Sequence, residues 1–508
     1  MAAQQKQLLM SVLQHIGHLP TPLLLFKRSG KSPAIPKNKY KKQLIGAEKM
    51  SKRDLNCDWQ KYYKDHLVTV EEAAKHIEPG DVIFLGNSTC IPYELLNYLY
   101  DHKEDYHDVT FFYNVTNVPS NMFLSHDSKE HFRLINMFNL PLDRMAMDEH
   151  AIEVCSAGYD QLGIAFAVYG GNTAASHFCP PDEDGWCNVG TNAIATHHDL
   201  TQSPKVVKKF GFIDSTGVYP SPGSHDTHCI HITEFDYIIE SDTQMMGMPV
   251  AEPTPFDKRI ASYIIPYIHS GDKVQIGFGG LGEEILRNMK NIPGTFEIYS
   301  EVMVESVIEL VESGKITKVT ASSPSASSEQ LYKYIASHPD KVKLLPREDC
   351  VEPLTIMQQD NIISINASFM CDLIGQCCSE AQGLKPYTGA GGSFAYIYGA
   401  QRAKGGRSFI CLRSTFKDAN GERQSNIVPW LPAGCMVTTP KNYVMYIVSE
   451  WGLADVYCRT YTDRIKALIK IAHPDYREWL KEQILTTPLI EEWDFRELDL
   501  FDNVDKNS

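Results

Sequence analysis

Short apolar runs alternate with segments of helical spacing along most of this chain, beginning near Trp59. The segment that starts at Thr69 has acidic residues in its first turn and ends near Ile77, as expected of a capped helix. Strands are predicted where the runs are short and apolar, at Val82–Leu85, Val109–Tyr113, Gly163–Val168, Lys208–Ile213 and Tyr237–Ile239. This alternation predicts an α/β fold with a mostly parallel sheet.

The same pattern recurs farther along the chain. Each segment has the order helix, Gly-Asp turn, strand, glycine turn and helix, and the matches fall at positions with special backbone needs. A shift of 191 positions places Ile77, Gly80, Asp81, Gly86, Leu95 and Asn97 on Ile268, Gly271, Asp272, Gly277, Leu286 and Asn288 without a gap. We therefore predict two related open-sheet α/β domains.

Composition divides the chain into a basic leader at 1–55, an N-terminal domain at 56–245, a C-terminal domain at 246–487 and an acidic tail at 488–508. The Met- and Pro-rich stretch Gln244–Pro255 marks the domain boundary. Before position 50 the leader has Glu48 as its only acidic residue. That composition fits an organelle transit peptide, a disordered arm, or a true start at Met50, and the leader is left out of the fold prediction.

Charge and composition exclude several classes of protein. The 48 basic and 63 acidic side chains give a net charge of −15, whereas nucleic-acid binding needs a concentrated basic face. No apolar run reaches the roughly 18 residues that a membrane span needs. The 13 cysteines are dispersed without a CxxC pair, which indicates reduced thiols and a cytoplasmic protein. A mitochondrial-type organelle matrix is the alternative if the leader is a transit peptide.

A glycine-rich turn follows the predicted strand that ends near Ile276. Its sequence is Gly277-Phe278-Gly279-Gly280-Leu281-Gly282, a GxGxxG motif, and Glu301 follows Gly282 by 19 residues after the next predicted strand, Thr295–Ser300. The motif is typical of dinucleotide binding, in which the acid binds a ribose. A tight turn without a ligand is a second interpretation. A third is that the glycines hold the phosphates of another nucleotide-bearing substrate and that Glu301 reacts.

A second glycine cluster is Gly389-Ala-Gly391-Gly392. Consecutive glycines let backbone N–H groups converge on an oxyanion or a phosphate, although such a cluster also suits a simple loop. Zinc ligands are suggested by His225, His228 and His231, but these lie in a predicted strand, where every third residue does not share a face. No metal is therefore expected. The chain also lacks a Gly-x-Ser-x-Gly elbow and a Walker lysine.

Several runs in the second half resemble one family and follow its order along the chain. They are Ser364–Ala367, Cys371–Gln376, Ser379–Ala381, Gly389–Gly392, Lys404–Ile410, Ser414–Lys417, Val448–Gly452 and Ala467–Asp475. From about Tyr63 to Leu485 the chain resembles the acetyl-CoA hydrolase/transferase family, in particular its butyryl-CoA:acetate and 4-hydroxybutyrate CoA-transferases.

The resemblance implies two similar α/β domains with the active site between them, and Glu301 as the nucleophile. It implies an oxyanion hole formed by Gly391 and Gly392, and it places Asn366 and Glu450 near the reacting carboxylate. The CoA site that it implies comprises Gly277, Phe278, Gly279, Gly280, Leu281, Gly389 and Lys417. This chain departs from the family at Tyr299-Ser300, where a His-Thr pair is usual, and at Ser393 and Ala395, where Gln and Asp are usual.

These features favour a CoA-transferase that moves CoA between a short-chain acyl-CoA and a free carboxylate such as acetate. The reaction would follow ping-pong kinetics through a glutamyl-CoA thioester, with coenzyme A as a substrate and no tightly bound cofactor. A short-chain acyl-CoA hydrolase is the main alternative, and a nicotinamide-dependent dehydrogenase and a non-catalytic CoA sensor are others. The expected partners are acyl-CoA and carboxylate substrates, without nucleic acid or membrane, in a homodimer or homotetramer.

Overall fold

The computed structural model describes residues 53–193, 200, 203, 205–214, 216, 218–242, 250–325, 328–382 and 385–496. Most of the predicted leader and the end of the predicted tail lie outside the described residues. The predicted domain boundary at 245–246 lies outside them as well, so the division into four parts stays a prediction. No helix in these described ranges is long and apolar enough to cross a membrane.

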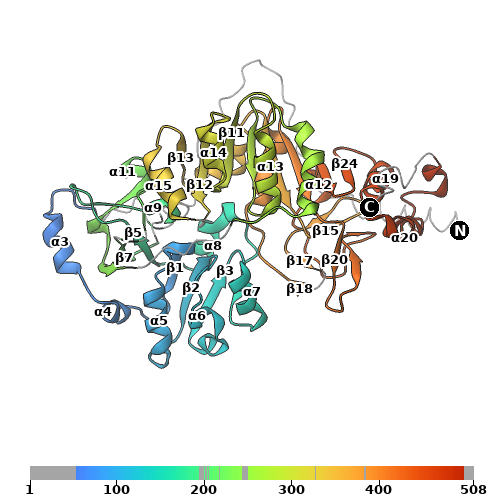
Figure 1. Ribbon diagram of the computed structural model, residues 1–508. Helices are drawn as coiled ribbons and strands as arrows, with labels where there is room; N and C mark the ends of the chain where they lie inside the picture. The colour runs from blue at the N-terminus through green and yellow to red at the C-terminus, as the bar shows by residue number, and fades with distance from the viewer. Residues whose placement is uncertain are drawn as a thin grey trace, which may run out of the picture. The chain divides into compact units, whose positions relative to one another are not determined.

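Seven strands, all parallel, form one sheet in the described part of the N-terminal half (Figure 1). In spatial order they are β4 Glu153–Val154, β3 Phe132–Asn136, β2 Val109–Asn114, β1 Val82–Asn87, β5 Thr173–Phe178, β7 Lys208–Asp214 and β9 Tyr237–Ser241. Helix α4 (Val70–Ala74) precedes this sheet. Thr69 caps it, as predicted, and Glu72 caps it reciprocally, but the helix ends before Ile77.

The C-terminal half repeats this strand order and adds one antiparallel edge strand among its described residues. In spatial order its strands are β13 Val342–Leu344, β12 Ile316–Pro324, β11 Phe296–Met303, β10 Lys273–Ile276, β14 Ile362–Ala367, β19 Arg407–Cys411, β23 Tyr446–Ser449 and β24 Gly452–Asp455. Because each of the first seven has a counterpart in the other half, the predicted duplication of an open α/β sheet is confirmed.

One predicted strand is wrong. The apolar run Gly163–Val168 belongs to a helix, α8 (Leu162–Val168), in which Leu162, Ala165 and Phe166 are buried and Ile164 and Val168 are exposed. Those buried positions are spaced by three and by one, which is helical spacing rather than the alternation of a strand. A short apolar run does not by itself distinguish a buried helix from a buried strand.

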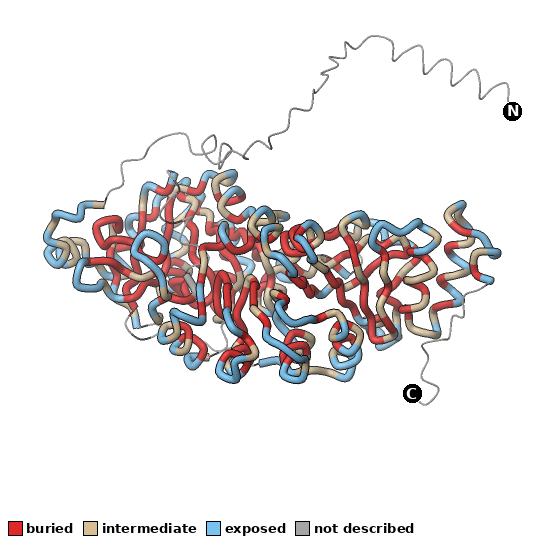
Figure 2. Tube along the Cα trace, turned by 90° about the horizontal axis from the view of Figure 1, so that it is seen from above, coloured by how far each residue is buried: buried red, intermediate tan, exposed pale blue. Residues whose placement is uncertain are grey.

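The central strands are covered on both faces. Along β1, Ile83 and Leu85 pack into one apolar cluster with α5 (Tyr93–Asp101), whereas Phe84 packs into another on the opposite face. The cluster that contains Phe84 continues into the C-terminal half through residues such as Val274 of β10. Figure 2 shows buried residues concentrated along the central strands of both halves. The two sheets therefore share one continuous core.

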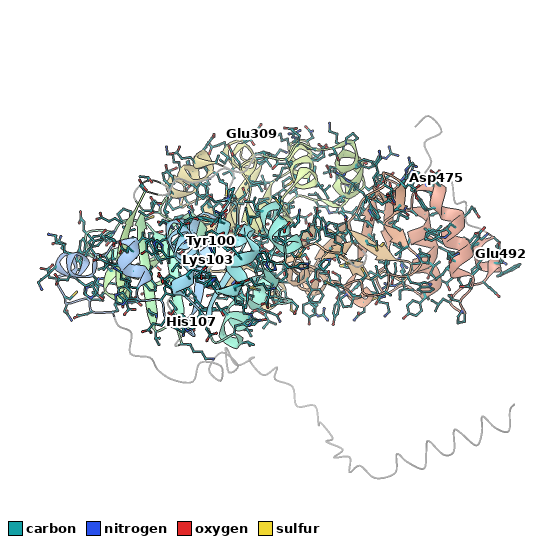
Figure 3. All side chains as sticks on the ribbon, turned by 90° about the horizontal axis from the view of Figure 1, so that it is seen from below. Tyr100, Lys103, His107, Glu309, Asp475 and Glu492 are labelled. Carbon is teal, nitrogen blue, oxygen red and sulfur yellow. The ribbon has the colours of Figure 1, made fainter. Side chains whose placement is uncertain are left out.

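The end of the described chain forms a smaller region on the C-terminal half. Helices α19 (Tyr461–Lys470) and α20 (Pro474–Ile484) enclose an apolar cluster there, beside short two- and three-stranded sheets. Charged side chains lie on the surface, as Figure 3 shows for Glu309, Asp475 and Glu492. These three acids pair with lysine or arginine at 2.6, 2.9 and 2.7 Å, and exposed pairs of this kind contribute little to stability.

Candidate active site

Glu301 lies near the carboxyl end of β11, a central strand of the C-terminal sheet. The strand continues to Met303, so the carboxylate does not end it as the sequence suggested. Strands β10 and β12 flank β11 as parallel neighbours and hold its backbone in place. Nearby polar contacts fix the strand end further, since the Ser300 hydroxyl donates to the carbonyl of Ile276 at 2.9 Å. Glu301 itself is half-buried.

The second glycine cluster packs directly against this carboxylate. A β-carbon at position 392 would lie 1.7 Å from Oε2 of Glu301, so any residue other than glycine would have to displace the carboxylate. Gly392 is also the N-cap of helix α18 (Ser393–Arg402), and no side chain caps that helix end. The first backbone N–H groups of a helix have no partner within the helix and carry partial positive charge. Glu301 therefore lies beside a helix N-terminus suited to an oxyanion.

The surroundings of Glu301 raise its pKa to about 7, first because the carboxylate is buried and second because Asp160 carries a like charge nearby. Among the described residues, no hydrogen-bond donor reaches its oxygens. The thiol of Cys350 and the phenol of Tyr396 lie close by, and burial raises the pKa of both well above their ordinary values. Glu301 is thus the ionisable group at this point that titrates near neutral pH.

The GxGxxG turn stands at the start of helix α13 (Gly280–Met289), directly after β10, as predicted. Gly279 has φ of +111°, and a β-carbon at Gly282 would lie 2.6 Å from the carbonyl oxygen of Gly277. At Gly277 and Gly279, by contrast, a β-carbon would meet open space, and the side chain of Phe278 is 54% exposed. The turn thus presents bare backbone to the solvent, where a phosphate could approach it.

The other predicted site residues occupy three different places. Asn366 on β14 forms a reciprocal amide pair with Gln275 on β10, at 3.0 and 3.3 Å. The carboxylate of Glu450, just after β23, accepts hydrogen bonds from the backbone N–H of Ser414 at 2.9 Å and from its hydroxyl. Lys417 is exposed at the end of β20 (Thr415–Lys417). The structure therefore brings Gly392 to Glu301 but shows no direct contact from Asn366, Glu450 or Lys417.

Two of the departures from the family motif, Ser393 and Ala395, lie in the first turn of α18. Ser393 is its first residue and is half-buried, whereas Ala395 is 2% exposed and belongs to the shared core. An Asp at position 395 would bury a charge in that core at a substantial cost. The alanine is therefore consistent with its surroundings.

Residues of the N-terminal half reach the glycine cluster. A β-carbon at Gly389 would lie 2.0 Å from the carbonyl oxygen of Met137, and one at Gly391 would lie 2.8 Å from the ring of Phe138. Both partners follow the carboxyl end of β3. The predicted position of the site between the two halves agrees with these contacts.

Three residues at this junction carry no sequence signal and were not predicted. The backbone N–H of Tyr159 donates to the carbonyl of Gly391 at 2.9 Å, and Asp160 is the acid whose charge acts on Glu301. Arg347, buried in the C-terminal half, donates to the carbonyls of both, at 3.3 and 3.0 Å. Arg347 is separated from Tyr159 by 188 positions and from Asp160 by 187 positions in the sequence, so tertiary packing brings them together.

The counterpart of Glu301 in the N-terminal half is an amide. Ile83 on β1 pairs with Phe111 on β2, just as Val274 on β10 pairs with Ile298 on β11. Asn114 lies three residues after Phe111, as Glu301 lies three residues after Ile298, so the two occupy equivalent positions in the two halves. Asn114 is buried and its amide donates to Asn87 at 3.5 Å. Of these two equivalent positions, the one in the C-terminal half therefore carries a carboxylate and the one in the N-terminal half carries an amide.

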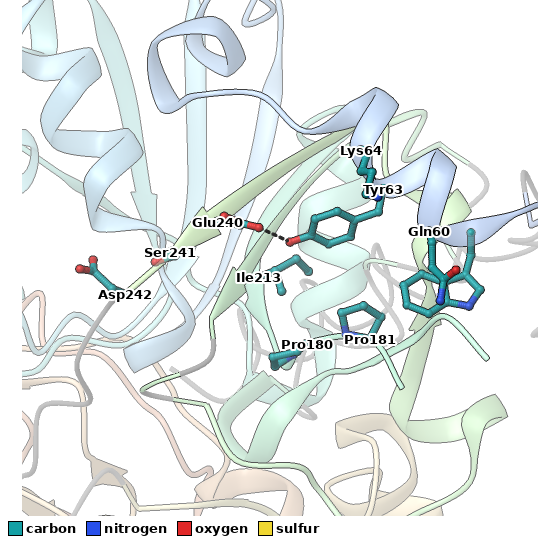
Figure 4. A pocket seen from close by; sticks show the side chains of 10 residues that line it. Gln60, Tyr63, Lys64, Pro180, Pro181, Ile213, Glu240, Ser241 and Asp242 are labelled. Carbon is teal, nitrogen blue, oxygen red and sulfur yellow. Dashed lines mark hydrogen bonds between the residues drawn. The ribbon is translucent and has the colours of Figure 1, made fainter. Parts of the chain in front are cut away.

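A separate pocket of about 790 Å³ lies away from these residues (Figure 4). It opens beside helix α3 (Trp59–His66), and the figure shows Tyr63 and Glu240 pointing toward one another across a hydrogen bond of 3.2 Å. None of the predicted site residues lines it. We place the candidate site at Glu301 because its carboxylate packs against the glycine cluster, whereas the carboxylates that line the pocket at α3, Glu240 and Asp242, are exposed.

The histidines that suggested zinc each have their own partners. His225 lies 2.8 Å from Asp182, His228 lies 3.1 Å from the carbonyl of Leu344, and His231 lies 2.7 Å from Thr233. The strand predicted here is wrong in part. His225 and His228 lie in the short helix α11 (His225–His228), His231 ends strand β8 (Cys229–His231), and a 3-10 turn follows it. Within the described ranges, no three His, Cys, Asp or Glu side chains are grouped so that they could hold a metal ion.

Two sheets with the same strand order, one of which carries the carboxylate of Glu301, define a duplicated α/β protein. Two family models match this chain, the acetyl-CoA hydrolase/transferase N-terminal domain over residues 48–252 and the C-terminal domain over residues 327–484. The chain belongs to the acetyl-CoA hydrolase/transferase family, and the resemblance seen in the sequence is confirmed.

Individual relatives cover nearly the whole described chain. The 4-hydroxybutyrate coenzyme A transferase of Clostridium kluyveri is 28% identical over 84% of this chain and 99% of its own length. The butyryl-CoA:acetate CoA-transferase of Anaerostipes caccae is 27% identical over 82% of this chain and 95% of its own. The crystal structure of RipA from Yersinia pestis shares the fold, with a TM-score of 0.73 and 24% identity over 85% of this chain and 100% of that one.

Proposed function

We propose that this chain is an acyl-CoA:carboxylate CoA-transferase that moves CoA between a short-chain acyl-CoA and a free carboxylate such as acetate. The observation that carries the proposal is Glu301, a half-buried carboxylate with a pKa of about 7 that lies against the N-terminus of α18. The names of the relatives, which act on 4-hydroxybutyrate and on butyryl-CoA and acetate, support the same class of substrate.

In the first half-reaction, the Glu301 carboxylate attacks the thioester carbonyl carbon of the acyl-CoA. The carbon–sulfur bond breaks, the CoA thiolate leaves, and a mixed anhydride joins Glu301 to the acyl group. The thiolate then attacks the glutamyl carbonyl carbon and releases the acyl group as a free carboxylate. Glu301 is left as a glutamyl-CoA thioester, so the thioester bond is kept and no ATP is needed.

In the second half-reaction, an incoming carboxylate attacks the glutamyl thioester and expels the CoA thiolate. The resulting anhydride is attacked by that thiolate at the new acyl carbonyl, which releases the new acyl-CoA and restores the Glu301 carboxylate. Each tetrahedral intermediate has a negative oxygen, and the backbone N–H groups at Gly391 and Gly392 would stabilise it.

The remaining predicted residues are assigned to substrate binding. The exposed backbone from Gly277 to Leu281 would receive the phosphates of CoA, and Gly389 and Lys417 would complete that site. Asn366 and Glu450, each fixed by hydrogen bonds at the carboxyl edge of the sheet, would orient the carboxylate substrate. Coenzyme A enters as a substrate, and none of these steps requires a tightly bound cofactor.

Intact-mass spectrometry tests the proposal. Wild-type protein incubated with butyryl-CoA should gain the mass of CoA, and borohydride should abolish that adduct by reducing the thioester. Glu301→Gln should form no adduct and should lose transfer to acetate by several orders of magnitude, because an amide cannot attack the thioester. Glu297→Gln, on the same strand, serves as the matched control. Release of free CoA without transfer to added acetate would instead identify a hydrolase.

A further inference from the structure

A buried arginine links the two halves of the molecule beside the nucleophile. Arg347 begins helix α16 (Arg347–Cys350), shortly after β13, and is 3% exposed. Its Nη1 donates to the backbone carbonyls of Tyr159 and Asp160 in the N-terminal half, at 3.3 and 3.0 Å. Both acceptors lie in the short 3-10 helix η4 (Tyr159–Gln161). One guanidinium nitrogen thus fixes two consecutive peptide groups of the opposite half.

Helix η4 also contacts the glycine cluster at 389–392. The backbone N–H of Tyr159 donates to the carbonyl of Gly391 at 2.9 Å, and the next residue, Gly392, packs against Oε2 of Glu301. A β-carbon at Gly158 would lie 2.5 Å from Oδ1 of Asp160 and 3.7 Å from the carbonyl oxygen of Gly391. Two hydrogen bonds therefore connect Arg347 through Tyr159 to Gly391, which precedes the glycine that packs against the Glu301 carboxylate.

We infer that Arg347 is a positioning residue of the transfer reaction, which holds Tyr159 against the glycine cluster and keeps Asp160 beside Glu301. This inference rests on the function proposed above. It gives the N-terminal half, through Tyr159 and Asp160, a part in the catalytic arrangement although that half carries no nucleophile. Arg347 would act by binding backbone carbonyls and not by touching the substrate.

The charge of Asp160 gives this arrangement a chemical consequence. Burial and Asp160 together raise the pKa of Glu301, and a more basic carboxylate is a stronger nucleophile. Acylation removes the charge of Glu301 and with it the repulsion from Asp160. Burial also raises the pKa of Asp160, while Arg347 opposes that rise and so favours the charged form. The other titratable groups that face Glu301, Cys350 and Tyr396, stay neutral at neutral pH.

Arg347→Lys tests the inference, because lysine keeps the charge but its flexible, strongly hydrated ammonium lacks the rigid planar group that holds Nη1 between the two carbonyls. We expect kcat for butyryl-CoA and acetate to fall by about tenfold to a hundredfold, since small displacements of catalytic groups cost rate steeply. The KM for butyryl-CoA should change less than about threefold, because the exposed turn at Gly277 is untouched. The acidic limb of the pH profile of kcat/KM should also move to lower pH.

A matched control is Arg464→Lys. Arg464 is likewise buried, and its Nη1 also donates to two backbone carbonyls, those of Ile374 and Lys441, at 3.0 and 2.9 Å. It lies in α19, outside the contacts described around Glu301. Arg464→Lys should lower thermal stability by an amount similar to Arg347→Lys while kcat and the pH profile stay as in wild type. Equal kinetic effects in the two variants would contradict a positioning role.

Asp160→Asn provides an independent test that does not depend on the folding of Arg347→Lys. The substitution is isosteric and leaves intact the backbone carbonyl that accepts from Arg347. The acidic limb of kcat/KM should shift to lower pH, because the pKa of Glu301 loses the contribution of the neighbouring charge. An unchanged pH profile in an active Asp160→Asn variant, or a wild-type kcat in Arg347→Lys, contradicts this inference but leaves the proposed function standing. A wild type without transfer or adduct overturns the proposed function itself.

Discussion

The carboxyl group of Glu301, the proposed nucleophile, also affects the stability of the folded protein. Its pKa of about 7 in the folded protein exceeds the ordinary value of 4.5, so the folded state binds a proton that the unfolded chain has already lost. Below about pH 4.5 both states are protonated and the group costs nothing. As the pH rises toward 7 and beyond, the folded protein must carry a buried charge that the unfolded chain carries in water. Stability therefore falls over this pH range.

Glu301→Gln removes that cost, so we expect the variant to gain stability relative to wild type as the pH rises from 5 to 8. The pH-dependent gain should amount to at most about 3 kcal/mol, since one pKa unit corresponds to about 1.4 kcal/mol. Urea unfolding midpoints at pH 5 and pH 8 measure it, with Glu297→Gln as the control on the same strand. A difference between variant and wild type that is equal at both pH values would contradict the raised pKa.

At the scale of elements, two glycine turns precede two helices and have different surroundings. The turn before α18 is closed, because Gly392 is pressed against Glu301, whereas the turn before α13 is open at Gly277. We expect Gly392→Ala to lower kcat by about a hundredfold, because the new methyl group must displace the nucleophile. Its φ of −94° suits alanine, so the thermal unfolding temperature should stay close to that of wild type.

Gly277→Ala is the natural comparison, because the new methyl group meets open space. We expect the KM for the CoA ester to rise about tenfold, since the methyl group would separate the backbone from the phosphates, while kcat changes little. Steady-state kinetics of the two variants side by side provides the measurement. If both variants changed the same kinetic constant, the division of roles between the two turns would be wrong.

Elements with a strong local signal could be predicted from the sequence, and elements defined by packing could not. The capped helix after Thr69 and the glycine turn at 277–282 have local residues that require them, and both are present. Helix α8 was mistaken for a strand because its apolar run is too short to show a period reliably. Arg347 could not be linked to Tyr159 because nothing in either local sequence encodes a contact across 188 positions.

At the scale of the whole molecule, the shared core governs which side chains reagents can reach. All 13 cysteines are free thiols, of which Cys458 is exposed, Cys57 and Cys435 are half-buried and the others are buried. Burial raises the pKa of the Cys350 thiol to about 12, and the thiolate is the reactive form. The core should therefore protect most thiols while the protein is folded.

We expect a thiol reagent to label Cys458 rapidly in the native protein at neutral pH and to label the buried cysteines only on unfolding. Stopped-flow absorbance with a chromogenic disulfide counts the fast thiols, and peptide mapping identifies them. Cys458→Ser should remove the fastest phase. Rapid native labelling of Cys350 would show that the region behind Glu301 opens more readily than its burial implies.

The amide at Asn114 has a consequence for stoichiometry. Two identical halves would give each chain two nucleophiles. In this chain the position equivalent to Glu301 holds Asn114, whose side chain cannot attack a thioester. With the function proposed here, each chain of 508 residues therefore stores one CoA equivalent at a time. The amount of covalently bound CoA would then equal the number of chains, whether the protein is a monomer or an oligomer.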